Sequence, residues 1–173
     1  MAYGLLLLRV VIGGVMLAHG LQKTFGWWNG PGPKGLRGWL ESMGFRMVAL
    51  MTLLLILGED GGLLFAVGLV TPLAALMIVT SQLVAISTTH WKNGFWAGGG
   101  GFEYNLTLIA VALAVCATGP GRFSFDRWFG WDGHWSGLWW AAGVLAVSIV
   151  SAAFILTALR KAPPQVQEAA DTV

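Results

Sequence analysis

The hydrophobic positions of the chain gather into five runs, each bounded by turn-forming or polar residues. The runs cover about residues 3–25, 45–70, 72–90, 103–118 and 137–159. A helix rises about 1.5 Å per residue, so about 20 residues cross the roughly 30 Å hydrocarbon core of a bilayer. The pattern predicts an all-α fold, a polytopic transmembrane helical bundle formed by residues 1–160.

A shorter pattern lies between the first two runs. Its apolar positions recur at i, i+3, i+4 and i+7, which is typical of a helix with one apolar face. These positions are Leu36, Trp39, Leu40 and Met43, whereas Lys34, Arg37 and Glu41 fall on other faces. We expect an interfacial helix over about residues 33–43. The polar tail, residues 161–173, is expected to be disordered.

The ten tryptophans agree with these spans, because none lies in the middle of one. Tryptophan is enriched at both membrane–water interfaces. We name the membrane face that carries residues 27–46 face B, and the opposite face A. Face B is expected to hold Trp27, Trp28, Trp39, Trp91 and Trp96, and face A to hold Trp128, Trp131, Trp135, Trp139 and Trp140. Lys and Arg are more numerous at face B, so the positive-inside rule predicts that face B is cytoplasmic.

Composition agrees with a membrane protein and excludes several classes. The chain is 56% hydrophobic and only 10% charged, whereas soluble domains carry about 25% charged residues. A net charge of +2 without any Lys/Arg run argues against nucleic acid as a partner. Cys116 is the single cysteine, so this chain alone forms no disulfide and binds no iron–sulfur cluster.

Several ionisable residues interrupt the hydrophobic spans. They are Arg9, His19, Glu59, Asp60, His90 and Glu103. A charge in the middle of a bilayer costs at least about 2.5–3.5 kcal/mol, so such residues face the protein interior and commonly mark function. On the first span Arg9, Gly13, Met16, Gly20 and Lys23 form one helical stripe, whose glycines would let a neighbouring helix approach closely.

Estimated depths place four of these residues on the face B side. From the rise per residue, His19 lies about 10 Å below face B and Glu59 about 20 Å below it, with Lys23, His90 and Glu103 near the rim. We expect a polar funnel that opens at face B. Arg9 approaches from face A, and we expect it to form a structural ion pair with Asp60, or with Glu59.

The residue types of the funnel indicate proton chemistry. A carboxylate beside an imidazole is a natural proton relay, so His19 and Glu59 are the candidate catalytic residues. Lys23, His90 and Glu103 are the candidate substrate-binding residues, for an anion or a quinone carbonyl. A metal site formed by the two histidines and two glutamates is an alternative, but no tight ligand spacing supports it, and none is predicted. A purely structural cluster is the other alternative.

Taken in order, these motifs resemble a known family. The residues that carry the resemblance are His19-Gly20-x-x-Lys23, Glu59-x-Gly61-Gly62, Gly68-Leu69-x-Thr71-Pro72, His90 with Gly94-Phe95, Glu103-Tyr104, and Gly119-Pro120-Gly121-Arg122-x-Ser124-x-Asp126. The ordered set is similar to the DoxX family of small bacterial and archaeal membrane proteins. The resemblance implies a four-helix core, to which residues 137–159 add a fifth helix. It also implies redox work: relatives resembling DoxD act in thiosulfate oxidation with quinone as the acceptor, and others are linked to oxidative-stress partners.

The leading hypothesis is a multi-pass cell-membrane protein that serves as the membrane subunit of an oxidoreductase system. It would transfer electrons or protons between a soluble oxidoreductase or sulfurtransferase partner and a quinone. Quinone is the candidate cofactor. A homo-oligomer is a further expectation. The alternative is a non-catalytic anchor or assembly factor. A small-solute transporter is less favoured, because two inverted halves are not visible in five spans.

Overall fold

The chain folds into a bundle of long helices. A computed structural model describes residues 2–160, and these contain helices and connections without any strand. The principal helices are α1 (Ala2–Phe25), α2 (Gly32–Ser42), α3 (Val48–Val67), α4 (Thr71–Ala85), α5 (Glu103–Thr118), α6 (Phe125–Trp128) and α7 (Leu138–Ala158). The expected disordered tail, residues 161–173, lies outside the described residues. The predicted all-α helical bundle is confirmed.

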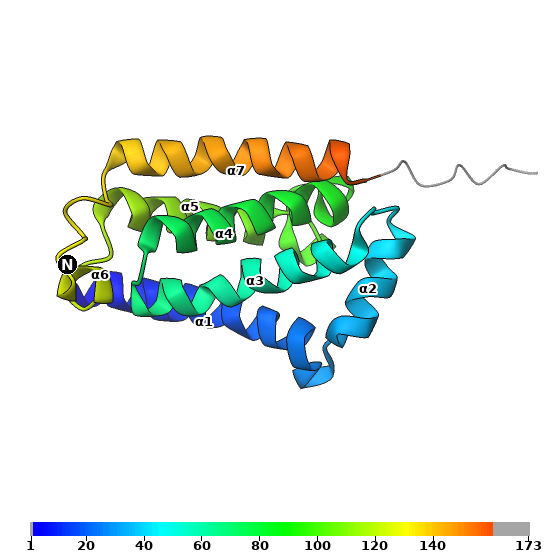
Figure 1. Cartoon of the computed structure of the whole chain (residues 1–173), viewed down its shortest axis with the longest axis horizontal. Coiled ribbons are helices and arrows are strands. Elements are labelled where there is room, and N and C mark those ends of the chain that lie inside the picture. The colour runs from blue at the N-terminus through cyan, green and yellow to red at the C-terminus, as the bar shows by residue number, and fades with distance from the viewer. Residues whose placement is uncertain (1, 161–173) are drawn as a thin grey trace, which may run out of the picture.

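The five long helices lie side by side and alternate in direction (Figure 1). Helix α1 packs against α3, whereas α4 lies centrally and packs against α3, α5 and α7. Helices α1, α3, α4 and α5 form a four-helix core, and α7 is the added fifth helix. Helix α2 lies at one end of the bundle and α6 at the other (Figure 1), so face B is the α2 end and face A is the α6 end.

Within residues 2–160, four helical segments are long and apolar enough to cross a membrane. They are Ala2–Phe25, Val48–Val67, Thr71–Asn93 and Leu138–Ala158. The third is longer than α4 because a π-helical turn, Ile86–His90, and a 3-10 turn, Trp91–Asn93, continue it. Helix α5 is apolar but has 16 residues, a length of about 24 Å. It packs beside α4 and completes the bundle.

Two hydrophobic clusters hold the helices together. The larger joins α1, α3, α4, α5 and α7 through Met16, Phe65, Ile78, Leu108, Val115 and Val144, among others. The smaller joins α2 to the start of α3 through Leu36, Leu40, Phe45 and Met51. The apolar side of α2 therefore packs on the bundle.

Close backbone contact sets the register between α1 and α3. A Cβ atom at Gly13 would lie 2.7 Å from the backbone N of Ala66, and one at Gly62 would lie 2.6 Å from the N of Leu17. Only glycine permits this approach. The buried residues of α1 are Arg9, Gly13, Met16 and Gly20, which confirms the stripe expected from the sequence. The register brings the last turn of α1 beside Glu59 and the first turns of α1 beside Gly68.

Candidate functional site

A partly buried ion pair joins α1 to α3. Lys23 Nζ, in the last turn of α1, donates a hydrogen bond to Glu59 Oε1 in the middle of α3. The Glu59 residue is 8% exposed. Its second oxygen, Oε2, is buried and has no hydrogen-bond partner among the described residues. A buried acceptor left unpaired costs about 1–3 kcal/mol, so Glu59 retains a hydrogen-bonding position that a ligand can fill.

The neighbouring carboxylate has a different environment. Asp60 lies against Gly20, where any Cβ atom would overlap its side chain. Thr24 Oγ1 donates to Asp60 Oδ2 at 3.4 Å. Asp60 and His19 are absent from the cavity lining described below, whereas Lys23 and Glu59 are part of it. The adjacent acids Glu59 and Asp60 therefore have different surroundings: Glu59 lines the cavity, whereas Asp60 packs against Gly20 of α1.

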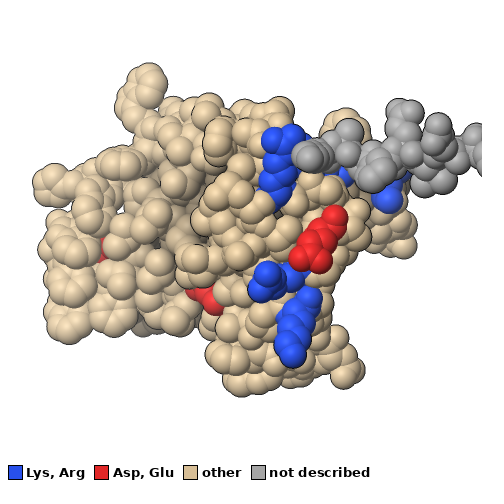
Figure 2. Space-filling model, turned by 45° about the vertical axis from the view of Figure 1, so that its right-hand side comes forward, with Lys and Arg blue, Asp and Glu red and all other residues tan. Residues whose placement is uncertain are grey.

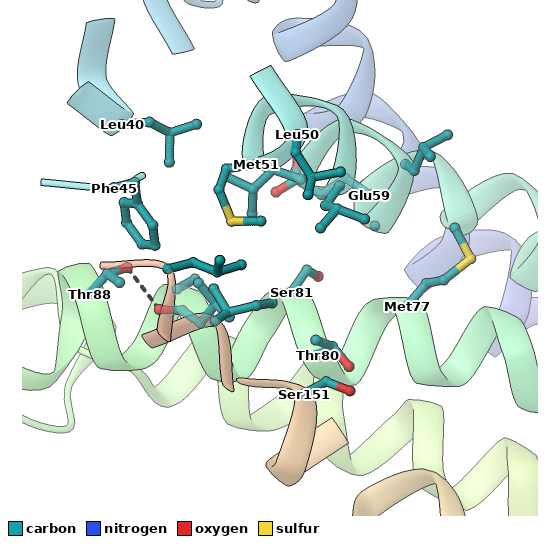
Figure 3. A pocket seen from close by; sticks show the side chains of 18 of the residues that line it. Leu40, Phe45, Leu50, Met51, Glu59, Met77, Thr80, Ser81, Thr88 and Ser151 are labelled. Carbon is teal, nitrogen blue, oxygen red and sulfur yellow. Dashed lines mark hydrogen bonds between the residues drawn. The ribbon is translucent and has the colours of Figure 1, made fainter. Parts of the chain in front are cut away.

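Lys23 and Glu59 lie at a cavity of about 690 Å³ between α3, α4 and α7. The volume is within the usual range of small-molecule sites, about 300–1,000 Å³. Most of the lining is apolar and includes Leu40, Phe45, Leu50, Met51 and Met77 (Figure 3). The lining also contains the hydroxyl residues Thr80, Ser81, Thr88 and Ser151. The site is an apolar space with a few polar groups on its walls.

The cavity is bounded on its open side by side chains that lie on the molecular surface. On α3, Leu54 is 42% exposed and Leu57 is 46% exposed; on α7, Val150 is 68% exposed and Phe154 is 59% exposed. All four line the cavity. Because α3 and α7 are membrane-spanning, an exposed apolar border between them faces lipid chains. The opening is therefore lateral.

The α2 end of the cavity is closed by contacts between the end of α7 and the α2–α3 connection. Arg46 N donates to Leu159 O at 2.6 Å, and Arg160 Nε donates to Met43 O at 3.1 Å. The Arg160 guanidinium also lies 5.8 Å from the centre of the Phe45 ring. These contacts attach α7 to the connection and make its last turns part of the cavity wall.

Arg9 lies at the other end of the bundle, in a second buried polar cluster. It is fully buried and donates to the Phe123 carbonyl oxygen. Asp126, also fully buried, accepts hydrogen bonds from Val70 N at 2.7 Å, Thr71 N at 2.9 Å and Thr71 Oγ1 at 2.6 Å. These bonds satisfy the amino end of α4, and Asp126 N donates to Gly68 O at 2.9 Å, beside the Arg9 guanidinium. The cluster ties the α6 segment to the α3–α4 turn.

The expected ion pair between Arg9 and Asp60 is not present. The α1–α3 register places Arg9 beside Gly68, where an added Cβ atom would overlap the guanidinium. Gly68 is eight residues, or about 12 Å, further along α3 than Asp60. The partner of Glu59 is Lys23. The acidic residue in the cluster around Arg9 is Asp126, in place of Asp60.

The expected funnel is also not formed. His19 is exposed on α1, since it lies about 100° around the helix from the buried Gly20. His90 Nδ1 pairs with Gly100 O at 2.8 Å, and Glu103 Oε2 accepts from Ala97 N at 3.0 Å. Both residues order the 91–102 loop, beside α5, and neither lines the cavity. Of the predicted site residues, the structure brings only Lys23 and Glu59 together in the cavity.

Charged side chains are concentrated at the α2 end. Figure 2 shows Lys, Arg and Glu side chains gathered there, whereas most of the visible surface has none. Exposed basic residues at this end include Lys34 and Arg37 on α2, Arg46 before α3, and Lys92 in the loop after α4. The cytoplasmic orientation of face B stays a prediction, which rests on these charges through the positive-inside rule.

Comparison with known proteins gives the family. The DoxX family model matches residues 4–91, which include α1 to α4 and both partners of the Lys23–Glu59 pair. The chain is 30% identical over 118 residues to the inner membrane protein YqjF of Escherichia coli (strain K12), an alignment that covers 66% of this chain and 90% of YqjF. No solved structure matches the chain significantly. The chain therefore belongs to the DoxX family and is a multi-pass protein of the cell membrane.

Proposed function

We propose that this protein is the membrane subunit of an oxidoreductase system and binds a quinone or quinol in the cavity between α3, α4 and α7. One observation carries the proposal: a partly buried Lys23–Glu59 pair, with Glu59 Oε2 buried and unpaired, lies at a cavity that is otherwise mainly apolar. A ligand for this cavity needs a polar head group and an apolar body. Quinones combine both and dissolve in the bilayer.

The pair offers one group suited to each redox state. A lysine ammonium is a donor only, so Lys23 would donate to the carbonyl oxygen of a quinone. An ionised glutamate is an acceptor only, so Glu59 Oε2 would accept the hydroxyl proton of a quinol. When the ligand changes between quinone and quinol, its hydroxyl proton would pass to or from Glu59, which would therefore act as the proton carrier. The proposal does not include His19, His90 or Glu103, since they lie outside the cavity.

The proposed reaction is the reduction of the quinone. It consumes two electrons and two protons and breaks both carbonyl π bonds of the quinone to form two hydroxyl groups. The electrons would come from a soluble oxidoreductase or sulfurtransferase partner, which is oxidised. Glu59 would carry one proton to the oxygen that it faces, and the second proton would come from solvent. The lateral opening would let the isoprenoid tail remain in the bilayer.

A second candidate is a non-catalytic membrane anchor or assembly factor. The separation of His19, His90 and Glu103 from the cavity favours it, because it leaves fewer polar groups for chemistry than the sequence predicted. In this candidate the Lys23–Glu59 pair serves only to hold α1 against α3.

Mass spectrometry of small molecules distinguishes the two functions. The protein would be transferred from native membranes into lipid nanodiscs, extracted with organic solvent, and compared with the variant Glu59→Gln. The quinone proposal predicts about one quinone per protein in the wild type and clear depletion in the variant. Wild-type nanodiscs whose quinone content matches the lipid background, with the variant differing only in yield or stability, would favour the anchor.

A further inference from the structure

Two hydroxyl groups of the cavity lack hydrogen-bond partners. Ser and Thr side chains in helices commonly bond to a backbone carbonyl three or four residues earlier. In this chain Thr52, Ser81, Ser87, Thr88, Thr107, Thr118 and Thr157 do so. Among the described helices, no such bond is formed by Thr80 or Ser151, which are partly exposed, or by the fully buried Ser148. Thr80 and Ser151 line the cavity and Ser148 does not.

The free hydroxyls lie across the cavity from Glu59. A Cβ atom at Gly58 would be 3.3 Å from Ser81 Cβ, so α3 and α4 are in close register there. Glu59 follows Gly58 on α3, and Thr80 precedes Ser81 on α4. Because the two helices are antiparallel, Glu59 and Thr80 lie at the same depth. Figure 3 shows Thr80 on α4 and Ser151 on α7, on the other side of the space from the α3 residues Leu50 and Met51.

We propose that Thr80 and Ser151 form a second polar subsite, which selects a ligand with oxygen atoms at two opposite edges of a flat head group. The inference rests on the proposed function and deepens it. One oxygen of a 1,4-benzoquinone would face Lys23 and Glu59, and the other would face the two hydroxyls. An amphiphile with a single polar end, such as a fatty acid, would leave the hydroxyls without a partner in an apolar cavity.

Hydroxyl groups suit both redox states of such a ligand. A hydroxyl donates one hydrogen bond and accepts others, so Thr80 and Ser151 can donate to a carbonyl and accept from a quinol hydroxyl. Ser151 belongs to α7, which lies beyond the residues that the DoxX family model matches. The fifth helix would thus contribute a specificity-determining residue of this chain.

The test compares two ligands with the same tail. One is a benzoquinone carrying a single isoprene unit, and the other is a phenol carrying that unit, which has one oxygen. Dissociation constants would be measured in nanodiscs from the quenching of tryptophan fluorescence. The double variant Thr80→Val with Ser151→Ala removes both hydroxyls. Ser87→Ala is the matched control, because the Ser87 hydroxyl donates to Leu83 O at 2.9 Å and Ser87 does not line the cavity.

We expect the double variant to bind the benzoquinone about tenfold more weakly, in keeping with the loss of one or two neutral hydrogen bonds. Binding of the phenol by the double variant, and binding of both ligands by Ser87→Ala, should stay within about twofold of wild type. If the double variant binds the benzoquinone as tightly as the wild type does, the subsite is overturned and the proposed function is not. Equal loss for both ligands would also overturn it, as general damage to the cavity. Absence of benzoquinone binding by the wild type would remove the proposed function together with the subsite.

Discussion

Lys23 reaches Glu59 across the tightest helix contact of the bundle and leaves one carboxylate oxygen of Glu59 unpaired beside an apolar cavity. The contact depends on glycines of both helices, and the charged residues lie within a turn or so of them. On α1 the motif is Gly20-x-x-Lys23, and on α3 it is Glu59-x-Gly61-Gly62. The glycines let the two helices approach closely, and this approach brings Lys23 within hydrogen-bonding distance of Glu59.

Substitution at the glycine contact tests how the pair is positioned. Gly13→Ala should lower the free energy of unfolding by about 1–3 kcal/mol, because the new Cβ atom overpacks against α3. At Gly13 that atom would lie 2.7 Å from Ala66 N and 2.8 Å from Ala66 Cβ, whereas nothing lies within 4 Å of a Cβ atom at Gly14. Thermal unfolding in detergent would measure the effect. Gly14→Ala is the control, and equal stability of the two variants would contradict the close contact.

The Arg9 cluster is expected to be structural. Arg9→Leu should destabilise the protein by about 2 kcal/mol, because it removes a charged hydrogen bond to Phe123 O and leaves the buried Asp126 charge without its basic neighbour. Adding Asp126→Asn should restore part of this loss, since it removes the uncompensated charge while retaining one amide oxygen for the α4 end.

The control for this prediction is Asp60→Asn in the Arg9→Leu background. The structure gives Asp60 no contact with Arg9, so this second change should restore nothing. Rescue by Asp60→Asn in place of Asp126→Asn, read from the melting temperature and the membrane yield, would instead support the pairing expected from the sequence.

The lateral opening predicts where a bound tail lies. A quinone analogue with a photoreactive group on its tail should label α3 and α7 at the border formed by Leu54, Leu57, Val150 and Phe154. Leu7 on α1 is also exposed, at 64%, but does not line the cavity. Peptide mapping after irradiation would locate the label. Labelling spread evenly over α1, α3 and α7 would indicate ordinary lipid contact and contradict the opening.

The helices could be predicted from the sequence, because hydrophobic periodicity and length determine a membrane span almost independently of its neighbours. Arg9, Gly13, Met16 and Gly20 were recognisable as the buried stripe for the same reason. The predicted spans near residues 103–118 and 137–159 correspond to α5 and α7. One local detail comes from the structure alone: Thr71 is the first residue of α4, and the distant Asp126 accepts hydrogen bonds from the amide groups of Val70 and Thr71.

The site could not be derived in the same way, because depth along a helix does not give the register or the direction of a side chain. Depth estimates placed Arg9 near Asp60 and His19 near Glu59. The Gly13–Gly62 contact sets a register in which Arg9 lies beside Gly68 and not beside Asp60. His19 lies about 100° around α1 from the buried Gly20 and is exposed. The pairing of Lys23 with Glu59 and the role of α7 depend on tertiary packing. The hydroxyl residues Thr80 and Ser151 within apolar spans were the available signal for the cavity.

The affinity of the protein for a short-chain benzoquinol, compared between wild type and Glu59→Gln, tests the central claim most directly. Glu41→Gln is the control, because Glu41 is exposed on α2 and does not line the cavity. We predict that Glu59→Gln, in nanodiscs, weakens quinol binding by tenfold or more, about 1.4 kcal/mol or more, through the loss of a charged acceptor. Glu41→Gln should bind as wild type does. Unchanged quinone and quinol affinities in Glu59→Gln, at unchanged thermal stability, would contradict the account.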